Sequence, residues 1–543
     1  MRGSDFDWAA MGQRLPESLR YGLLLGGVGK PHLAGLARTA LSDAATPDLG
    51  LRQGLGLDLL LAAWEAGPLD GALAGALTSM DDRARFLPPR VRAMAEAAAT
   101  NWSEPPQAGG GLAEYAARRE HAALLDWLEA NMRAQPQNLY WRQHLLDTAY
   151  LLCDWERAES ALADPWPEAL AAAREAFRGD VLFQQGDFAG AERRYAAARP
   201  LRPALFRRGQ CFFRMGRLGE AAGQWRMALA QAPWNVNLLL RLHDRLTGLD
   251  TPGEDALPGS AAICLYTSGK AQVLDATLAA LFASDLGGAA VVVLDNASPD
   301  DTPQVLSAWK DRMGDALTVV SLPVNIGAPA ARNWLMRHEA VAGRDFVAYL
   351  DDDALVPQDW QARLAQAVRA YPRAGVWGCK VVDLAAPGRI QHAEVNLYGD
   401  DGPEPSFATL CAQDLDFGQF DALRPCLSVT GCFHLFGAEA LCRCGDFDIR
   451  FSPTQYDDLD HDLRLAALGR TAVCQGHCGV RHARLSGALL HQNALATGNS
   501  RGNLGKLAAK HPQQARRALR EAVEKHLLED ALRKQAVIAE SRD

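Results

Sequence analysis

The 543-residue sequence predicts an α/β domain with a mainly parallel, doubly wound sheet, preceded by an all-α domain of helical repeats. The first 250 residues are rich in Ala, Leu, Arg and Glu, with apolar residues at helical spacing. From about residue 261 the pattern changes to short β-rich runs that alternate with helical runs. A chain of this length is long enough for two or more domains.

Two loop-like breaks divide the chain. The Pro- and Gly-rich segment 104–111 separates an N-terminal helical region, residues 1–103, from the repeat helices of residues 112–247. A second break, also rich in Gly and Pro, precedes the α/β domain, which we place at residues 260–500. The tail, residues 503–543, is charged and amphipathic, and we expect it to be helical.

The helical half contains an internal repeat with a spacing of thirty residues. The repeated positions are Phe183, Gly186, Phe188, Ala191, Tyr195, Ala198 and Pro203, then Phe213, Gly216, Leu218, Ala221, Trp225, Ala228 and Pro233. The glycine suits a tight helix–helix turn, the alanine a close contact, and the proline the end of the second helix. A weaker copy starts at Tyr150. The pattern resembles the tetratricopeptide repeat, whose arrays bind peptides or proteins; a stack that only supports the second half or a dimer is the alternative.

Four β-rich runs alternate with helical runs in the second half. The predicted strands are 261–266, 290–294, 317–322 and 346–350, and the helices after them extend to about 282 and over 299–313, 329–338 and 357–371. This order predicts parallel strands joined by crossover helices on both faces of one sheet.

Three consecutive carboxylates, Asp351, Asp352 and Asp353, directly follow the strand at 346–350. They repel one another, and a bound divalent cation would remove the repulsion. Ligands of open α/β sheets also bind beyond the carboxyl ends of the strands. A solvated acidic turn is the alternative.

Polar residues also follow the second and third predicted strands. Asp295 could accept hydrogen bonds from a nucleobase or a ribose, with a turn-forming aspartate as the alternative. Ser298 is placed to N-cap the next helix, with Asp301 at the capping-box position. Gly327 permits close backbone approach before a helix start that offers N–H donors to an anion. Arg332 could add positive charge near a phosphate, although an ordinary surface arginine is also possible.

In this order the motifs resemble family 2 glycosyltransferases of the GT-A fold, and among these the rhamnosyltransferase-type members. The resemblance covers residues 261–485 and leaves out the helical half. The motifs are 295–298, 325–327, 330–333, 350–353, 378–383, 388–393, 429–433, 445–448, 457–465 and 480–482.

The resemblance implies a role for each strand end. Residues expected to bind the nucleotide-sugar donor are Thr267, Asp295, Asn325, Gly327, Arg332, Asp351 and Asp352. Asp353 and His482 would bind a divalent metal ion, Mn²⁺ or Mg²⁺, that holds the diphosphate. The donor would be a UDP-, dTDP- or GDP-sugar, and the enzyme a hexosyl- or deoxyhexosyltransferase.

The family's acidic pair falls on Asp457 and Asp458. One of these carboxylates would take the proton from the acceptor hydroxyl as it attacks the anomeric carbon, which implies inversion. The family usually has Glu at the first position, so the resemblance leaves open which of the two is the base. A solvated helix N-terminus is the alternative reading of this acidic cluster.

We therefore expect an inverting, metal-dependent glycosyltransferase. The repeats favour a protein acceptor, and a surface-polysaccharide intermediate is the alternative; residues 394–428 are expected to help form the acceptor side. A nucleotidyltransferase would share the fold and the acidic site, but the residues after the first strand make a poor Gly-rich phosphate loop. A non-catalytic repeat scaffold is disfavoured because each expected acidic position is present.

The composition excludes several classes of protein. The net charge of −9 argues against a nucleic-acid partner. No apolar stretch is long enough for a membrane span, and residues 1–5 do not begin an apolar signal segment, so we expect a cytoplasmic protein. The 11 cysteines fit free thiols better than disulfides. A structural zinc site among Cys442, Cys444, Cys474, His477, Cys478 and His482 is a minor alternative, since the spacings match no common zinc motif.

Overall fold

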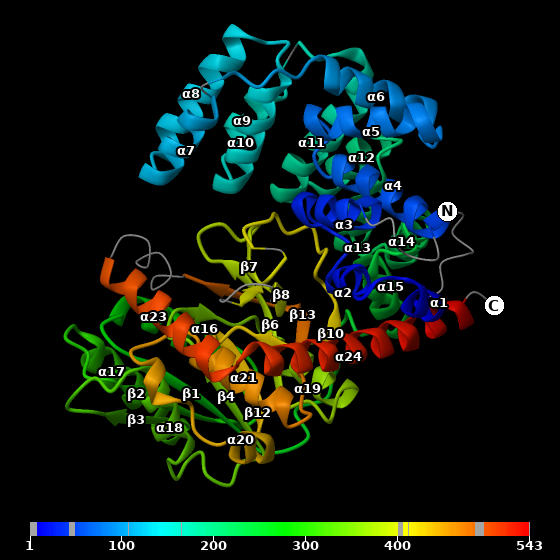
Figure 1. Cartoon of the computed structure of the whole chain (residues 1–543). Helices are drawn as coiled ribbons and strands as arrows, with labels where there is room; N and C mark the ends of the chain where they lie inside the picture. Colours follow the sequence, from blue (N-terminus) through cyan, green and yellow to red (C-terminus); the bar gives the residue numbers. More distant parts are fainter. Residues whose placement is uncertain are drawn as a thin grey trace. The chain divides into compact units, whose positions relative to one another are not determined.

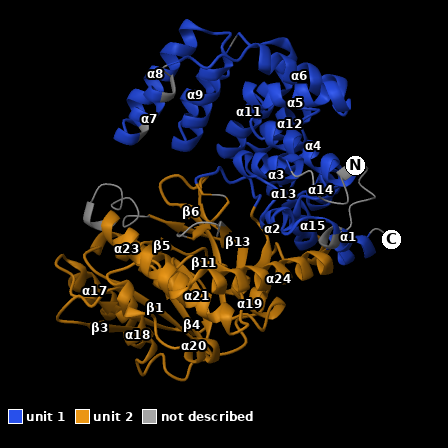
Figure 2. Ribbon diagram, viewed as in Figure 1, with its two compact units in different colours: residues 1–245, 413–419, 535–543 blue, residues 246–412, 420–534 orange. Residues whose placement is uncertain are grey.

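The computed structural model describes residues 8–42, 49–106, 108–163, 165–399, 405–410, 412–483 and 494–541. The N-terminal residues 1–5 and parts of the predicted acceptor segment 394–428 lie outside them. The chain divides into two compact units (Figures 1 and 2). Unit 1 comprises residues 1–245, 413–419 and 535–543, and unit 2 comprises residues 246–412 and 420–534.

The described part of residues 8–247 is helical, which confirms the predicted all-α region. Its helices are α1 Trp8–Arg14, α2 Glu17–Leu25, α3 Lys30–Ser42, α4 Leu49–Glu65, α5 Gly71–Ala84, α6 Pro89–Thr100, α7 Ala108–Arg118, α8 His121–Ala134, α9 Leu139–Leu152, α10 Trp155–Ala161, α11 Ala171–Gln184, α12 Phe188–Ala197, α13 Arg202–Arg214, α14 Leu218–Gln231 and α15 Val236–Thr247.

The predicted break at 104–111 is shorter than expected, because α7 already begins at Ala108. Its glycines therefore lie in a helix. A Cβ added at Gly111 would lie 3.0 Å from the ring of Trp127 in α8. The missing side chain lets the two helices approach each other.

The thirty-residue repeat corresponds to the helix pairs α11–α12 and α13–α14. Gly186 and Gly216 form the turns with φ of 84° and 75°, as the positive-φ prediction requires. The proline prediction was wrong for Pro203, which stands in the first turn of α13 and does not end α12. Its missing N–H costs nothing there, since the first N–H groups of a helix have no partner within it.

A second glycine in each pair makes a contact that the sequence did not reveal. A Cβ at Gly179 would lie 2.6 Å from the Tyr195 ring, and one at Gly209 would lie 2.4 Å from the Trp225 ring. Both rings are buried. In each pair, an aromatic side chain of the second helix therefore packs directly against a glycine of the first helix.

Segment 413–419, although it lies between strands of unit 2 in the sequence, packs within unit 1. The Phe417 ring lies 4.4 Å from the Arg207 guanidinium, and the carbonyl of Gly418 accepts a 3.1 Å hydrogen bond from Gln210. Gln419 offers its carbonyl to Asn237 at 2.8 Å. Unit 1 is therefore assembled from separate stretches of the chain.

Unit 2 contains a 10-stranded sheet with the order β10-β13-β6-β12-β4-β1-β2-β3, β5 and β7 pairing at its side, and a smaller sheet β11-β8-β9. The strands are β1 Ala261–Thr267, β2 Ala290–Asp295, β3 Leu317–Ser321, β4 Phe346–Leu350, β5 Ala354–Leu355, β6 Val376–Asp383, β7 Ile390–His392, β8 Glu394–Gly399, β9 Ser406–Ala408, β10 Leu423–Cys426, β11 Ser428–Val429, β12 Phe433–Gly437 and β13 Ala472–His482. The helices are α16 Ala271–Ala283, α17 Thr302–Met313, α18 Ala328–Met336, α19 Trp360–Ala370, α20 Ala438–Cys444, α21 Asp457–Ala467, α23 Ala494–Lys510 and α24 Gln513–Glu540, of which the residues of α24 from 535 on belong to unit 1.

The predicted mainly parallel α/β fold is confirmed. Strands β3, β2, β1 and β4 pair in parallel, as do β6 and β13. Strand β12 runs antiparallel between β4 and β6, and β10, β5 and β7 also pair antiparallel with their neighbours in this sheet. The sheet has helices on both faces. On one face, apolar side chains such as Ile263 and Leu350 belong to a core that also includes residues of α16, α17 and α19. Tyr349, next to Leu350 in β4, points to the opposite face, where its hydroxyl donates a hydrogen bond to the Arg332 carbonyl of α18.

The predicted helix cap at Ser298 was wrong. Helix α17 begins at Thr302, and Asp300 Oδ1 accepts hydrogen bonds from the Thr302 N–H at 3.1 Å and its hydroxyl at 2.6 Å. Ser298 instead accepts a 3.0 Å hydrogen bond from the Gly269 N–H. The chain thus uses Ser298 to join the β1 and β2 strand ends, and the loop is longer than the capping pattern suggested.

Among the described residues, no helix combines the length and the apolar character needed to cross a bilayer.

The glycine–aromatic contacts predict that Gly209→Ala will destabilise the protein. Because the Trp225 ring is fully buried and cannot move aside, the added methyl group should lower the free energy of unfolding by about 1–3 kcal/mol. Urea unfolding followed by helical circular dichroism would measure this. Gly223→Ala in α14 is the matched control: a Cβ there meets nothing within 4 Å, so it should be neutral or stabilising by up to about 1 kcal/mol. Equal effects of both changes would contradict the packing argument.

Candidate active site

The carboxyl ends of β1 and β2 lie side by side, in register at Thr267 and Asp295. Both side chains are buried. Asp295 Oδ1 accepts a 2.9 Å hydrogen bond from the Ser298 N–H, the turn-forming contact that was the alternative to a donor-binding role. Its proposed contact with a base or ribose stays a prediction.

An asparagine pair fixes the loop after β3. Asn325 Oδ1 accepts hydrogen bonds from Asn296 Nδ2 at 3.0 Å and from the Gly327 N–H at 2.9 Å, and Asn296 Oδ1 accepts one from the Ile326 N–H at 2.9 Å. Gly327 has φ of 79°, which glycine adopts without strain. The amide of Asn296, to which the sequence analysis gave no role, therefore sets the shape of this loop.

The three aspartates after β4 have different surroundings. Asp353 is almost fully buried: its Oδ1 lies 2.9 Å from His482 Nε2 and its Oδ2 accepts a 3.1 Å hydrogen bond from Lys270 Nζ. Asp352 is also buried and accepts a 2.7 Å hydrogen bond from the same ammonium. Asp351 is half-exposed, with Oδ2 3.8 Å from His482 Nε2.

Lys270 is a site residue to which the sequence analysis gave no role. It stands three residues after the end of β1, and only the pairing of β1 with β4 brings it to the aspartates. Burial disfavours its charge, but Asp352 and Asp353 outweigh this effect and raise the pKa of Lys270. The ammonium thus supplies one positive charge among three carboxylates.

Opposite pKa shifts separate Asp351 from Asp353. Burial opposes the charge of Asp353, yet the hydrogen bond from His482 and the charge of Lys270 prevail and hold its pKa below the usual range. For Asp351, whose side chain is only partly exposed, desolvation by the surrounding protein prevails and raises the pKa, against the opposing charge of His482. Asp353 is therefore the firmly ionised member of the triplet.

The donor atoms at this edge fit a divalent cation. Within the described part of the chain, ligand atoms of Asp351, Cys432 and His482 all lie within 4.8 Å of one another, and Asp353 contacts the same imidazole. Gln391 Oε1 accepts from His482 Nδ1 at 2.9 Å, which leaves Nε2 directed to the carboxylates. Burial raises the pKa of the Cys432 thiol, so the effective donors are carboxylate oxygen and imidazole nitrogen, which suit Mn²⁺ or Mg²⁺.

The acidic pair at the start of α21 is divided between two partners. Asp457 is buried and its Oδ2 bonds Arg332 Nη1 at 2.5 Å. Asp458 is half-exposed, and its Oδ2 accepts a 2.9 Å hydrogen bond from the Gly431 N–H. Burial raises the pKa of Asp457 to about 6, against the charge of Arg332.

Arg332 does not lie on the protein surface, the alternative that the sequence analysis considered. Only 4% of it is exposed, and its guanidinium lies 5.3 Å from the ring centroids of both Tyr266 and Phe447. The structure gives it Asp457 as a partner, and its expected role at a phosphate stays a prediction.

Two consecutive residues join the acidic pair to the cation cluster. The Gly431 N–H donates to Asp458, and the carbonyl of Cys432 accepts a 3.0 Å hydrogen bond from the Asp351 N–H. A Cβ at Gly431 would lie 2.6 Å from Asp458 Oδ2 and 2.9 Å from Arg332 Nη2. Only glycine leaves room for these two side chains at this point.

A second carboxylate of α21 fixes the same segment one turn further along. Asp462 Oδ2 accepts hydrogen bonds from the Ser428 hydroxyl at 2.7 Å and from the Val429 N–H at 3.2 Å. Burial raises the pKa of Asp462 to about 8 against these bonds, and burial lowers the pKa of neighbouring His434 to about 4. Both groups are therefore mainly uncharged at neutral pH.

The minor zinc alternative is not supported. Among the described residues, His482 alone of its six proposed ligands belongs to a group with metal-binding geometry. The side chains of Cys474 and Cys478 are buried, whereas Cys442 is exposed.

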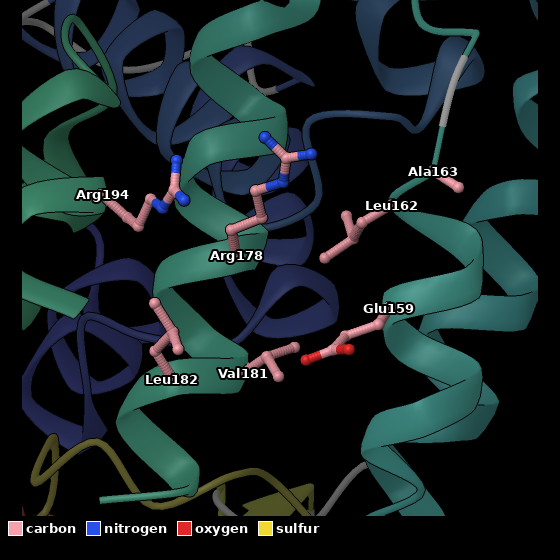
Figure 3. A pocket seen from close by; sticks show the side chains of 7 residues that line it. All are labelled: Glu159, Leu162, Ala163, Arg178, Val181, Leu182 and Arg194. Carbon is pink, nitrogen blue, oxygen red and sulfur yellow. The ribbon is translucent and has the colours of Figure 1, made fainter. Parts of the chain in front are cut away.

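A separate pocket of about 290 Å³ lies in unit 1 between α10, α11 and α12 (Figure 3). Glu159, Arg178 and Arg194 are its charged lining residues. Both guanidiniums also pair with Glu175, at 2.8 and 2.9 Å. This pocket shares no residue with the acidic edge of unit 2.

Residues 260–428 match the family model described as Glycosyl transferase family 2. The matched range includes the strand ends up to Asp353 and stops before Gly431, Asp458 and His482. No curated protein matches the chain. In this range the chain is similar to family 2 glycosyltransferases, and the rhamnosyltransferase-type resemblance stays a prediction.

Three solved structures are similar to parts of the chain. GalNAc-T7 with UDP, GalNAc and Mn²⁺ is 13% identical over 42% of this chain and 44% of its own, with a TM-score of 0.34. Mannosyltransferase PcManGT from Pyrobaculum calidifontis, in complex with GDP-Man and Mn²⁺, is 21% identical over 59% and 87%, with a TM-score of 0.33. S. aureus TarS 1–349 is 16% identical over 44% and 65%, with a TM-score of 0.30. The chain thus spans less than half of GalNAc-T7 and just under two thirds of the TarS chain.

The pKa of Asp462 predicts a pH-dependent effect of Asp462→Asn. An unfolded aspartate titrates near pH 3.9, so between about pH 4 and 8 the folded state binds the extra proton. The stability contributed by Asp462 therefore falls as pH rises through this window, by at most about 1.4 kcal/mol per pH unit. Asparagine does not titrate, so the free energy of unfolding of the variant, relative to that of the parent protein, should increase from pH 5 to pH 8.

Urea unfolding of both proteins at these two pH values would measure the gain. Asp311→Asn, at an exposed position of α17, is the control and should show the same difference from the parent at both. A pH-independent difference for Asp462→Asn would contradict a protonated buried carboxyl.

Proposed function

We propose that unit 2 transfers a sugar from a nucleotide-sugar donor to an acceptor hydroxyl, with inversion and with the help of a divalent metal ion. One observation carries the proposal. Gly431 and Cys432, adjacent in the chain, contact Asp458 and Asp351, so a half-exposed carboxylate stands next to a cluster suited to a cation. Such a pair supplies a base for the acceptor and a binding site for a diphosphate leaving group.

Of the acidic pair, Asp458 is the better candidate for the general base. Asp457 is buried and held by Arg332, whereas Asp458 is half-exposed and has only backbone N–H partners among the described residues, Gly431 and Leu459. In the proposed step Asp458 takes the hydroxyl proton as the acceptor oxygen bonds to the anomeric carbon. The bond from that carbon to the diphosphate breaks, and the nucleoside diphosphate leaves with the electron pair.

Arg332 and Asp457 would act together behind the base. A buried arginine that is hydrogen-bonded to a buried carboxylate fixes the first turn of α21, from which Asp458 projects. We therefore assign Arg332 to positioning, in place of the phosphate contact that the resemblance implied.

The donor side would use the edge formed by β1, β2 and β4. Thr267, Asp295, Asn325 and Gly327 would meet the nucleoside, with Asp352 toward the diphosphate. Asp351, Asp353 and His482 would hold the metal ion, which when bound neutralises charge on the leaving diphosphate. With the Nδ1 proton held by Gln391, loss of the Nε2 proton that is shared with Asp353 would leave Nε2 free for this role.

We further propose a protein acceptor. The helix pairs of unit 1 and the pocket lined by Arg178, Arg194 and Glu159 support this choice, because stacked helix pairs provide surfaces for extended peptides. Donor turnover with and without a peptide acceptor would separate it from a polysaccharide intermediate.

Asp458→Asn tests the base. Asparagine keeps the shape and can still accept from Gly431, but it cannot take a proton, so release of nucleoside diphosphate from UDP-, dTDP- and GDP-sugars should fall about 10²- to 10⁴-fold. Affinity for Mn²⁺ and nucleoside diphosphate should stay within about twofold, since the carboxylate touches neither. Asp311→Asn on the outside of α17 should keep full turnover. Full turnover by Asp458→Asn would defeat the assignment.

Removal of the metal tests the donor side. Chelation with EDTA should abolish turnover, and Mn²⁺ or Mg²⁺ should restore it. Asp353→Ala removes the firmly ionised carboxylate, so Mn²⁺ affinity measured by calorimetry should fall at least about tenfold. Asp311→Ala serves as the matched control. Unchanged Mn²⁺ affinity in Asp353→Ala would overturn the metal assignment.

A further inference from the structure

Helix α23, which follows the last strand of the sheet, is bound to the loop that leads into the acidic pair (Figure 1). This loop, residues 451–456, connects a short 3₁₀ turn at Ile449–Phe451 to the first residue of α21. The tail therefore contacts the segment of unit 2 that directly precedes Asp457 and Asp458.

Asn503 makes the central contact. It is only 1% exposed, and its Nδ2 donates to the carbonyl oxygens of Phe451 at 2.8 Å, Thr454 at 2.9 Å and Gln455 at 3.2 Å. Its Oδ1 accepts a 2.9 Å hydrogen bond from Lys506 Nζ, which defines the orientation of the amide. The two N–H groups of one buried amide are thus shared among three carbonyl oxygens of a loop that has few backbone hydrogen bonds of its own.

The loop needs such support because two of its residues have unfavourable backbone conformations. Gln455 and Tyr456 have φ of 81° and 68°, in the left-handed region that non-glycine residues rarely adopt. These residues directly precede Asp457. A backbone in this region persists only where surrounding contacts hold it.

Further residues of the tail bind the segments on either side of the loop. Lys506 Nζ donates to the Arg450 carbonyl at 2.7 Å. Lys510 Nζ lies 2.7 Å from Asp448 Oδ2 and 2.8 Å from Asp460 Oδ2. Asp460, in the first turn of α21, is fully buried and also contacts His511 at 2.8 Å.

The opposite side of the loop contacts the donor side. The Pro453 carbonyl accepts a 2.8 Å hydrogen bond from the Ala328 N–H at the start of α18. A Cβ at Gly327 would lie 2.9 Å from Ser452 Oγ. The loop is therefore held between α18 on one side and Asn503 on the other.

We propose that α23 is a positioning element of the active site, in which Asn503 holds the 451–456 loop and so fixes the carboxylates of Asp457 and Asp458. The inference rests on the proposed function for its effect on catalysis. Asn503 touches no reacting group, so it acts on the rate through the backbone that precedes the base. Misplacement of a catalytic group by about 1 Å is enough to reduce a rate about 10²-fold.

Hydrogen–deuterium exchange tests the structural part without reference to activity. Asn503→Leu keeps the side-chain size but removes the donor. Exchange should become faster in the peptides that contain residues 451–460 and Ala328, and stay unchanged in β2 (Ala290–Asp295). Asn499→Leu, on the same helix but half-exposed and not bonded to these carbonyls, is the matched control and should leave exchange unchanged. Unchanged exchange in residues 451–460 of Asn503→Leu would overturn the proposal.

Turnover tests the catalytic part. In Asn503→Leu, kcat for donor turnover should fall about 10- to 100-fold, while the Kd for Mn²⁺–nucleoside diphosphate stays within about twofold. Asn503→Gln, which keeps an amide donor, should recover part of the rate. A rate equal to that of the parent despite faster exchange, or an equal loss of Kd and kcat, would overturn the positioning role.

Two additional results keep the test decisive. If Asn503→Leu does not fold, Lys506→Met at an exposed position removes the support of the amide, and it should give a smaller change of the same kind. If the parent protein turns over no nucleotide sugar, the proposed function fails, while the exchange experiment still decides whether Asn503 holds the loop.

Discussion

The crowding of carboxylates at one edge of a sheet is the constraint on which the rest of unit 2 depends. Like charges at short distance destabilise one another, and burial adds a desolvation cost. A different interaction offsets this free-energy cost at each of the carboxylates. The Lys270 ammonium lies between Asp352 and Asp353, the Arg332 guanidinium pairs with Asp457, and Asp462 stays protonated.

These different solutions also explain why the carboxylates can have different tasks. Under the proposed function, a carboxylate that is bound by a guanidinium would be a support, one that is kept ionised by a lysine and a histidine would be a cation ligand, and one that has only backbone donors would keep a free lone pair for a proton. Position 458 has the third environment because Gly431 leaves space for it. The side chain that is absent at 431 matters as much as those that are present.

The order of elements from residue 261 to about 371 could be predicted because the four strands there are short apolar runs, as in residues 290–294, whereas the strands after residue 371 were not predicted. The acidic residues 351–353 could be placed at a strand end because they directly follow such an apolar run. Contacts between residues far apart in the sequence could not be predicted from local patterns. Arg332 and Asp457 lie 125 positions apart, and nothing in either local pattern reveals the pair.

Local sequence patterns also did not predict the direction of each strand or the exact ends of the helices. An antiparallel strand such as β12 has the same apolar periodicity as its parallel neighbours, so its insertion between β4 and β6 depends on topology alone. Ser298 carries a capping sequence but serves to join two strand ends. The residues of the tail that hold the 451–456 loop are ordinary helix formers in sequence, and the role of Asn503 follows only from what it meets.

Unit 1 is built from stretches that are far apart in the chain, since residues 413–419 complete a surface made by residues before 245. During synthesis on a ribosome the helical pairs emerge first and must wait for more than a hundred further residues before Phe417 and Gly418 reach them. A gene fragment that stops at residue 245 would leave Arg207 and Gln210 without these partners. Unit 1 can therefore be completed only after most of the chain up to residue 419 has been synthesised.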